Sequence, residues 1–369
     1  MNEKIKNILF IVVVIFLVIF LFLFLLTSCK KEYTPKQLEK LISNNANNYF
    51  SKHTDELPQD GSSMKLSLVN LVNKGIIDDL EDMLDKNTTC SGDLTIENNN
   101  GYYMYSPSIS CISGNNSYST TNLNDALMEN VTASGNGLYL INNEYYFRGD
   151  NLNNYLIFDG LLWRITKINS DNSIRIIQST KNKSVVWDNR YNSEYKKANG
   201  YNDLVLNNIN SRIKDTLDEY YSSEKLISDK AKGFIKKTNL CIGKRSETDT
   251  TKDGSIECSN ILSDQYMGLI QLNEYMIASL DENCTTAIST ACRNYNYLAT
   301  MENNYWTLTA DSANTYKVFK ISTTASSANA NSNAMARLVI NISENTNVTG
   351  TGSKDDPYIV SGLKSEIEK

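Results

Sequence analysis

The residues of this sequence that could do chemistry are seven cysteines and a single histidine, His53. Nucleophilic catalysis by Ser/His/Asp or Cys/His arrangements needs a histidine beside the nucleophile. No glycine-rich phosphate loop follows a strand-like stretch, and paired carboxylates such as Asp78-Asp79 stand in turn-like contexts. We therefore expect no catalytic residues and no cofactor, and we predict that the protein is not an enzyme.

Six of the cysteines predict disulfide bonds. Several connectivities are open to six cysteines, and we expect sequence neighbours to pair. No Cys-x-x-Cys occurs, so a zinc site is disfavoured and no metal is expected. Disulfides form in oxidising compartments, which indicates an extracellular location. The expected pairs are Cys90 with Cys111, Cys241 with Cys258, and Cys284 with Cys292.

Arg148-Gly149-Asp150 is the tripeptide by which some extracellular proteins hold animal cell-surface receptors. It stands between an aromatic, strand-like stretch and an Asn-rich segment. Gly and Asp are ordinary turn residues. We expect a turn between two strands here and no receptor binding.

The segment "DTTKDGSIECSN", which begins at Asp249, partly matches a calcium-binding loop. Its third position is Thr251 and its twelfth is Asn260, where such a loop carries a bidentate Glu. We therefore expect a polar hairpin tip inside the Cys241–Cys258 loop. The sequence identifies no ligand-binding residues.

The N-terminal segment predicts attachment to a membrane. Residues 8–26 are an unbroken apolar run that follows Lys4 and Lys6. At about 1.5 Å per residue, a helix of this length nearly spans a hydrocarbon core of roughly 30 Å. Leu26-Thr27-Ser28-Cys29 also fits a bacterial lipobox, in which the cysteine is lipidated. Residues 1–29 are thus expected to be a membrane anchor, either a transmembrane helix or a lipoprotein signal that ends at Cys29.

Residues 30–120 predict a small α+β module. Thr34, Pro35 and Gln37 form a helix start with a capping box, and residues 66–75 read as a second helix that stops at Gly75. Two strand-like stretches then flank an Asn-Asn-Asn-Gly turn, closed by the Cys90–Cys111 pair. Residues 121–137 are small and polar and are expected to form a linker.

Residues 138–369 predict a β-rich domain with two or so helices, which makes the chain α+β overall. Asp159-Gly160 is a strong two-residue hairpin signal that sets Phe158 opposite Leu161 and Leu156 opposite Trp163. Apolar spacing predicts one helix over residues 206–220 and a shorter one over residues 272–280.

Two resemblances add to this reading. The order of an apolar helix, an amphipathic helix and a small disulfide-closed sheet resembles pilin-like modules of bacterial surface proteins, although the prepilin cleavage signal is absent. The region 138–362 resembles a group of uncharacterised bacterial surface proteins, whose closing segments are similar to the C-type-lectin-like fold of formylglycine-generating enzymes and phage tropism proteins. The motifs that carry this second resemblance are "YYFRGDNLNNYLIFDGLLWRITKIN", "VWDNRYN", "MGLIQLNEYMIAS", "YWTLTADSANTYKVFKIS" and "ARLVINISENTNVTGTGSKDDPYIV".

The sequence also departs from that pattern. Arg337-Leu338 stands where the family usually has Arg-Pro. The copper-binding cysteines of formylglycine-generating enzymes have no counterpart here, so sulfatase maturation is not carried over.

The functional expectation combines the anchor, the cysteines and the composition. The net charge is −6 with no basic tract, which argues against nucleic acid, and the 22 tyrosines suit recognition surfaces. We predict a protein of the bacterial cell membrane that contacts the membrane through residues 8–26. Its lectin-like domain would bind an extracellular glycan or protein without catalysis. The alternative is a structural pilin-like or pseudopilin-like subunit with partners in a surface assembly.

Overall fold

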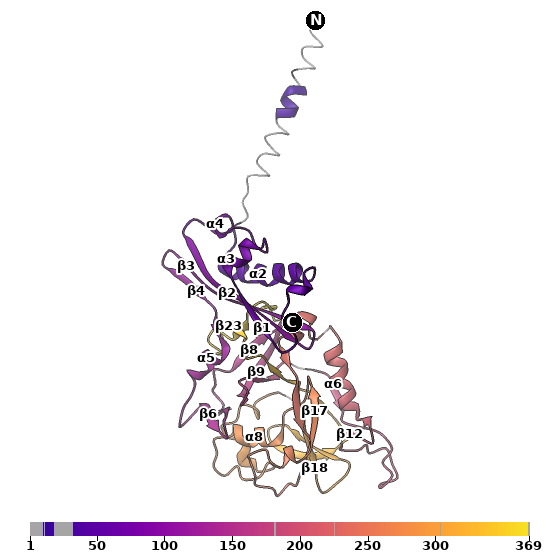
Figure 1. Cartoon of the computed structure of the whole chain (residues 1–369). Coiled ribbons are helices and arrows are strands. Elements are labelled where there is room, and N and C mark those ends of the chain that lie inside the picture. Colours follow the sequence, from indigo (N-terminus) through magenta and orange to yellow (C-terminus); the bar gives the residue numbers. More distant parts are fainter. Residues whose placement is uncertain are drawn as a thin grey trace.

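A computed structural model of the protein describes residues 10, 12–17, 32–180, 182–224, 226–302 and 304–367 (Figure 1). These residues form two hydrophobic cores. The smaller core lies within residues 38–111, and the larger one gathers Met104 with residues 123–363. Sheets of four, ten and six strands, and two of two strands, account for most of the architecture.

The N-terminal module is a four-stranded antiparallel sheet in the order β1-β2-β3-β4, covered by helix α2. Helix α2 begins at the predicted capping box of Thr34 and Gln37, and its Leu38, Ile42 and Phe50 are fully buried against the sheet. The elements are α2 (Pro35–Phe50), β1 (Ser63–Ser67), α3 (Leu68–Asn73), α4 (Leu80–Met83), β2 (Thr88–Asn99), β3 (Tyr102–Ser113) and β4 (Asn116–Ser119), with a 3-10 turn at Thr54–Glu56.

The ten-stranded sheet is the centre of the second module. Its main path runs β14-β22-β10-β9-β8-β24-β23-β5, and β7 joins β6 to β9. The strands are β5 (Thr121–Asn122), β6 (Gly137–Ile141), β7 (Glu144–Arg148), β8 (Tyr155–Phe158), β9 (Leu161–Ile168), β10 (Ile174–Gln178), β14 (Ile235–Lys236), β22 (Val339–Ile342), β23 (Asn347–Thr349) and β24 (Tyr358–Val360).

A six-stranded sheet lies at the end of the molecule far from α2 (Figure 1). It contains β11 (Ser184–Val186), β16 (Lys244–Arg245), β18 (Tyr305–Asp311), β19 (Lys317–Ile321), β20 (Ala325–Asn329) and β21 (Asn333–Met335). Two strand pairs stand apart, β12 (Val205–Leu206) with β13 (Ile209–Asn210), and β15 (Thr238–Cys241) with β17 (Ile261–Gln265). The helices of this module are α5 (Leu123–Met128), α6 (Arg212–Ser222), α7 (Asp229–Lys232) and α8 (Leu272–Ala278), with 3-10 turns at Glu257–Ser259 and Thr290–Arg293.

The expected fold class, α+β, is wrong. The described part of the chain is β-rich, with several sheets, and most of its helices are short. Within the described residues no helix is both long and apolar enough to cross a membrane. Most of the apolar run 8–26, and Cys29, lie outside the described residues.

Two predicted segments also differ in the structure. The helix expected over residues 206–220 begins only at Arg212, because Asn207 and Asn208 adopt positive φ angles in the β12–β13 turn and Ser211 caps the helix. Within the segment expected as a linker, β5 pairs with β23, and Leu123 and Leu127 of α5 are fully buried. Residues 121–128 therefore belong to the larger core.

The two modules are in close contact. Asn99 donates a hydrogen bond of 2.6 Å from its Nδ2 to the carbonyl oxygen of Gly233, just after α7. A Cβ atom at Gly233 would lie 2.4 Å from the backbone of Tyr103, so only glycine permits this approach. Ser106 accepts hydrogen bonds of 3.1 Å from both the backbone and the side-chain nitrogens of Asn347. The sheet of one module thus packs directly on the strands of the other.

Candidate functional site

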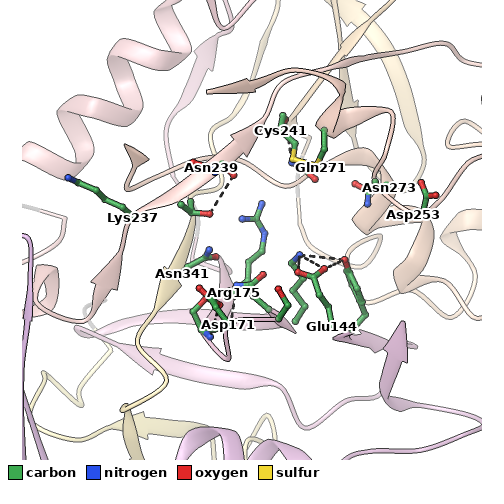
Figure 2. A pocket seen from close by; sticks show the side chains of 18 of the residues that line it. Glu144, Asp171, Arg175, Lys237, Asn239, Cys241, Asp253, Gln271, Asn273 and Asn341 are labelled. Atoms are coloured by element: carbon green, nitrogen blue, oxygen red, sulfur yellow. Dashed lines mark hydrogen bonds and ion pairs between the residues drawn. A yellow bond between two sulfur atoms is a disulfide. The ribbon is translucent and has the colours of Figure 1, made fainter. Parts of the chain in front are cut away.

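A polar cleft of about 450 Å³ opens between the ten-stranded sheet and the loops around the Cys241–Cys258 disulfide (Figure 2). Strands β7, β9, β10 and β22 line one side, and β15, the 253–258 segment and the start of α8 line the other. Its volume falls in the range of about 300–1,000 Å³ typical of small-molecule sites. The residues that define its chemistry are Glu144, Lys167, Arg175, Cys241, Asn273 and Asn341.

Two buried amides in this cleft have an unpaired oxygen. Asn273 is 3% exposed and Asn341 is 6% exposed, and the Oδ1 atom of each accepts no hydrogen bond. In Figure 2 they lie on either side of the Arg175 side chain. A buried acceptor left unpaired costs about 1–3 kcal/mol, and native structures contain few of them. Both residues line this cleft, which makes it the candidate binding site.

A buried ion pair fixes the centre of the cleft. Arg175 on β10 donates from Nε to Glu274 Oε1 at 2.8 Å, and both side chains are less than a tenth exposed. Glu274 also accepts a hydrogen bond of 2.9 Å from the backbone nitrogen of Gln271, which closes a capping box at the start of α8. The pair therefore holds β10 and α8 at a fixed separation, and the guanidinium is charge-balanced within the cleft.

A second ion pair lines the edge of the cleft. Lys167 Nζ lies 2.8 Å from Glu144 Oε2, and the Tyr146 hydroxyl donates to the same oxygen at 2.5 Å. Burial raises the pKa of the Tyr146 hydroxyl well above its usual value, so it stays protonated and acts as a donor. These groups form a satisfied polar rim.

The disulfide at the cleft wall confirms a sequence prediction. Cys241 and Cys258 are bonded and both line the cleft. The other two predicted pairs are also confirmed, Cys90 with Cys111 across paired positions of β2 and β3, and Cys284 with Cys292. All three bridges lie within a module. The predicted lipidation residue Cys29 lies outside the described residues.

The carboxylates of the partial calcium loop have protein partners. Glu257 is fully buried and accepts a hydrogen bond from Arg245 Nε at 2.8 Å. Asp249 accepts from the backbone nitrogen of Ser246 at 2.7 Å, and Asp253 accepts from Ser255. These side chains therefore stabilise the loop itself, as expected of a polar hairpin.

The Arg148-Gly149-Asp150 tripeptide ends strand β7. Arg148 donates from Nε to the Ile277 carbonyl and from Nη2 to the Ser279 carbonyl, each at 2.9 Å. Gly149 has φ +114, and its nitrogen donates to the Ala278 carbonyl. The arginine and glycine thus attach β7 to the end of α8, and only Asp150 is exposed.

The groups in or near the cleft that could do chemistry are bonded or paired, and the histidine lies elsewhere. His53 lies in the N-terminal module, where it stacks on Tyr49 at 4.1 Å between ring centroids. The cysteines of the cleft are bonded to each other, and Glu144 and Glu274 are paired with cations. The arrangement can accept hydrogen bonds from a polar ligand and donate hydrogen bonds to it.

Sequence reasoning missed the residues of this cleft. Asn341 interrupts the apolar stretch "RLVINI", and Asn273 with Glu274 follows Leu272 at the start of "LNEYMIA". A polar residue inside a strand that reads as buried is the signal that could have found Asn341, because such a side chain needs a partner.

Comparison with known proteins finds no matching family, no matching relative among curated proteins and no matching solved structure. The pilin-like and C-type-lectin-like resemblances therefore stay predictions.

Proposed function

We propose that the protein is an extracellular binding protein of the bacterial surface whose polar cleft binds a glycan. The observation that carries the proposal is the pair of buried amides, Asn273 and Asn341, with unpaired oxygens in one cleft. Sugar hydroxyls are donors that fit such acceptors and can also accept from the remaining N–H groups of Arg175. Among the ligand classes expected from the sequence, a glycan agrees better with a polar cleft of this volume than a protein surface does.

The three disulfides support a location in an oxidising compartment. Attachment to the outer face of a membrane is proposed from the sequence alone, through residues 8–26 or a lipid on Cys29. Cell fractionation with and without residues 1–31, and with Cys29→Ala, tests that attachment. Recovery of the full chain in the soluble fraction would contradict it, and copurification with fibres would favour the structural-subunit alternative.

A glycan array probed with residues 32–369 tests the binding function. Both modules are included because they share an interface. We expect retention of at least one glycan class, and Asn273→Ala and Asn341→Ala should each weaken that binding about tenfold, equivalent to ~1.4 kcal/mol. Asn115→Ala is the matched control, because Asn115 is exposed in the β3–β4 turn. An empty glycan array, or binding that both cleft variants leave unchanged, would reject the glycan proposal.

A further inference from the structure

A second cavity of about 550 Å³ adjoins the polar cleft. Asp253 lines both cavities. The second cavity has a cationic side formed by Arg148 and Lys252 and an apolar side formed by Ile141, Met276 and Ile277. We call it the cationic pocket. A ligand long enough to pass Asp253 would occupy both.

Arg148 is held rigidly at this pocket. Two of its nitrogens donate to the carbonyl oxygens of Ile277 and Ser279, and its guanidinium lies 4.9 Å from the centre of the Tyr139 ring. These neutral partners orient the guanidinium without cancelling its charge. Among the residues that the structure describes, no ion pair includes Arg148.

Lys252 adds a second positive charge to the same pocket. Its pKa is lowered by partial burial and by the positive charge of Arg148. No ion pair with Lys252 is found in the described part of the chain either. Asp253, the nearest acidic residue in sequence, accepts hydrogen bonds of 2.9 and 2.6 Å from the nitrogen and hydroxyl of Ser255. Two cations thus face one cavity without a paired carboxylate.

We propose that the cationic pocket binds the carboxylate of an acidic sugar, so that the ligand is an acidic oligosaccharide extending from the polar cleft past Asp253. This inference rests on the proposed glycan-binding function and names the class of glycan. An oriented guanidinium beside an ammonium is well suited to a carboxylate. The half-buried side chain of Ile141 provides an apolar surface for the carbon face of a sugar ring, and the unpaired amides of the cleft take the hydroxyls of the next unit.

The test compares matched acidic and neutral probes on residues 32–369. Binding on the array is first compared between acidic and neutral glycans. Affinities are then measured for the best acidic glycan and its neutral counterpart, with sialyllactose against lactose and trigalacturonate against its methyl ester as the standard pairs. We expect the acidic member to bind about tenfold more tightly at low salt, and the ratio to shrink as salt screens the charges. Equal affinities for acidic and neutral members would overturn the inference while leaving glycan binding intact. No binding to any glycan would instead reject the proposed function.

Single substitutions distinguish the contributions of the two cavities to binding. Lys252→Gln should lower the acidic-to-neutral affinity ratio at least fivefold, whereas Asn341→Ala should weaken both members and preserve the ratio. Lys354→Gln, at an exposed lysine, is the control and should change neither. Arg148→Gln should act like Lys252→Gln, but its bonds to the end of α8 also stabilise the fold, so Lys252→Gln decides the matter. An unchanged ratio in Lys252→Gln would overturn the proposal.

Discussion

Glu97 Oε2, on the sheet of the N-terminal module, accepts a hydrogen bond of 2.7 Å from the hydroxyl of Ser343 in the second module. Asn345 Nδ2 donates to the same oxygen at 2.9 Å. Glu97 is 5% exposed and Ser343 is fully buried, so water does not replace these contacts easily. The carboxylate therefore ties the end of β22 to β2.

Replacement of Glu97 should destabilise the whole protein. Glu97→Ala leaves the donors of Ser343 and Asn345 without their acceptor, and we expect a loss of about 1–3 kcal/mol in the free energy of unfolding. Urea denaturation monitored by tryptophan fluorescence measures it. Glu282→Ala, at an exposed glutamate, should cost less than about 0.5 kcal/mol. Equal effects of the two substitutions would show that the interface bond contributes nothing.

Cleavage of the loop after α5 should leave the two pieces of the chain associated. A protease site inserted at Ser134-Gly135, in an exposed loop after α5, cuts the chain without touching a disulfide. The cut protein should elute as one species in native size-exclusion chromatography and separate in denaturant without reductant. Separation under native conditions would contradict both the packing of α5 in the larger core and the shared interface. Fragments still joined in denaturant would refute the local disulfide pairing.

The tripeptide at the end of β7 should matter for folding through its glycine and not through its aspartate. At Gly149 the φ of +114 is strained for any side chain, and a Cβ atom would lie 1.9 Å from Asn136 Oδ1. Gly149→Ala should therefore cost about 1–3 kcal/mol in thermal or urea unfolding. Asp150→Glu, at an exposed position, should leave stability and any host-cell adhesion unchanged. Adhesion lost in folded Asp150→Glu would show that the tripeptide is a receptor motif after all.

Lys230 should make stability depend on pH. Burial, with Lys40 nearby, lowers its pKa from 10.5 to about 8, although Asp159 opposes the shift. Between about pH 8 and pH 10.5 the unfolded chain binds more protons than the folded one at this site, so this residue's contribution to stability rises with pH. Urea unfolding of the wild type and Lys230→Met across this window measures the difference. We expect the wild type to gain stability relative to the variant as pH rises, whereas Lys354→Met should show no such trend.

Local signals in the sequence were sufficient to predict the structure where neighbouring residues determine it. Asp159 and Gly160 both adopt positive φ angles, and the register that they predict is confirmed, with Phe158 opposite Leu161 and Leu156 opposite Trp163. The Asn100-Gly101 turn likewise aligns β2 with β3 so that Cys90 and Cys111 are partners. In these cases a turn type and alternating side chains define the pairing.

The polar cleft could not be predicted because its parts are distant in sequence. Arg175 and Glu274 form one ion pair across 99 positions, and Asn341 comes from a third segment. Nothing in the residues near Asn341 shows that β22 pairs with β10 or that its amide faces the loops beyond Cys241. The same limit explains the error over residues 121–137, whose polar composition hides the two leucines of α5 that the larger core needs.

The pairing of β5 with β23 has a mechanical consequence. The chain passes from the N-terminal module into the second module through β5, and Asn122 and Thr121 pair there with Asn347 and Val348, close in sequence to Ser343. If a bound ligand pulls on the cleft while the N-terminal end is held, the load crosses this junction. The β5–β23 ladder and the Glu97 contact then share the tension, so the two modules resist stretching together before either one is pulled from the other.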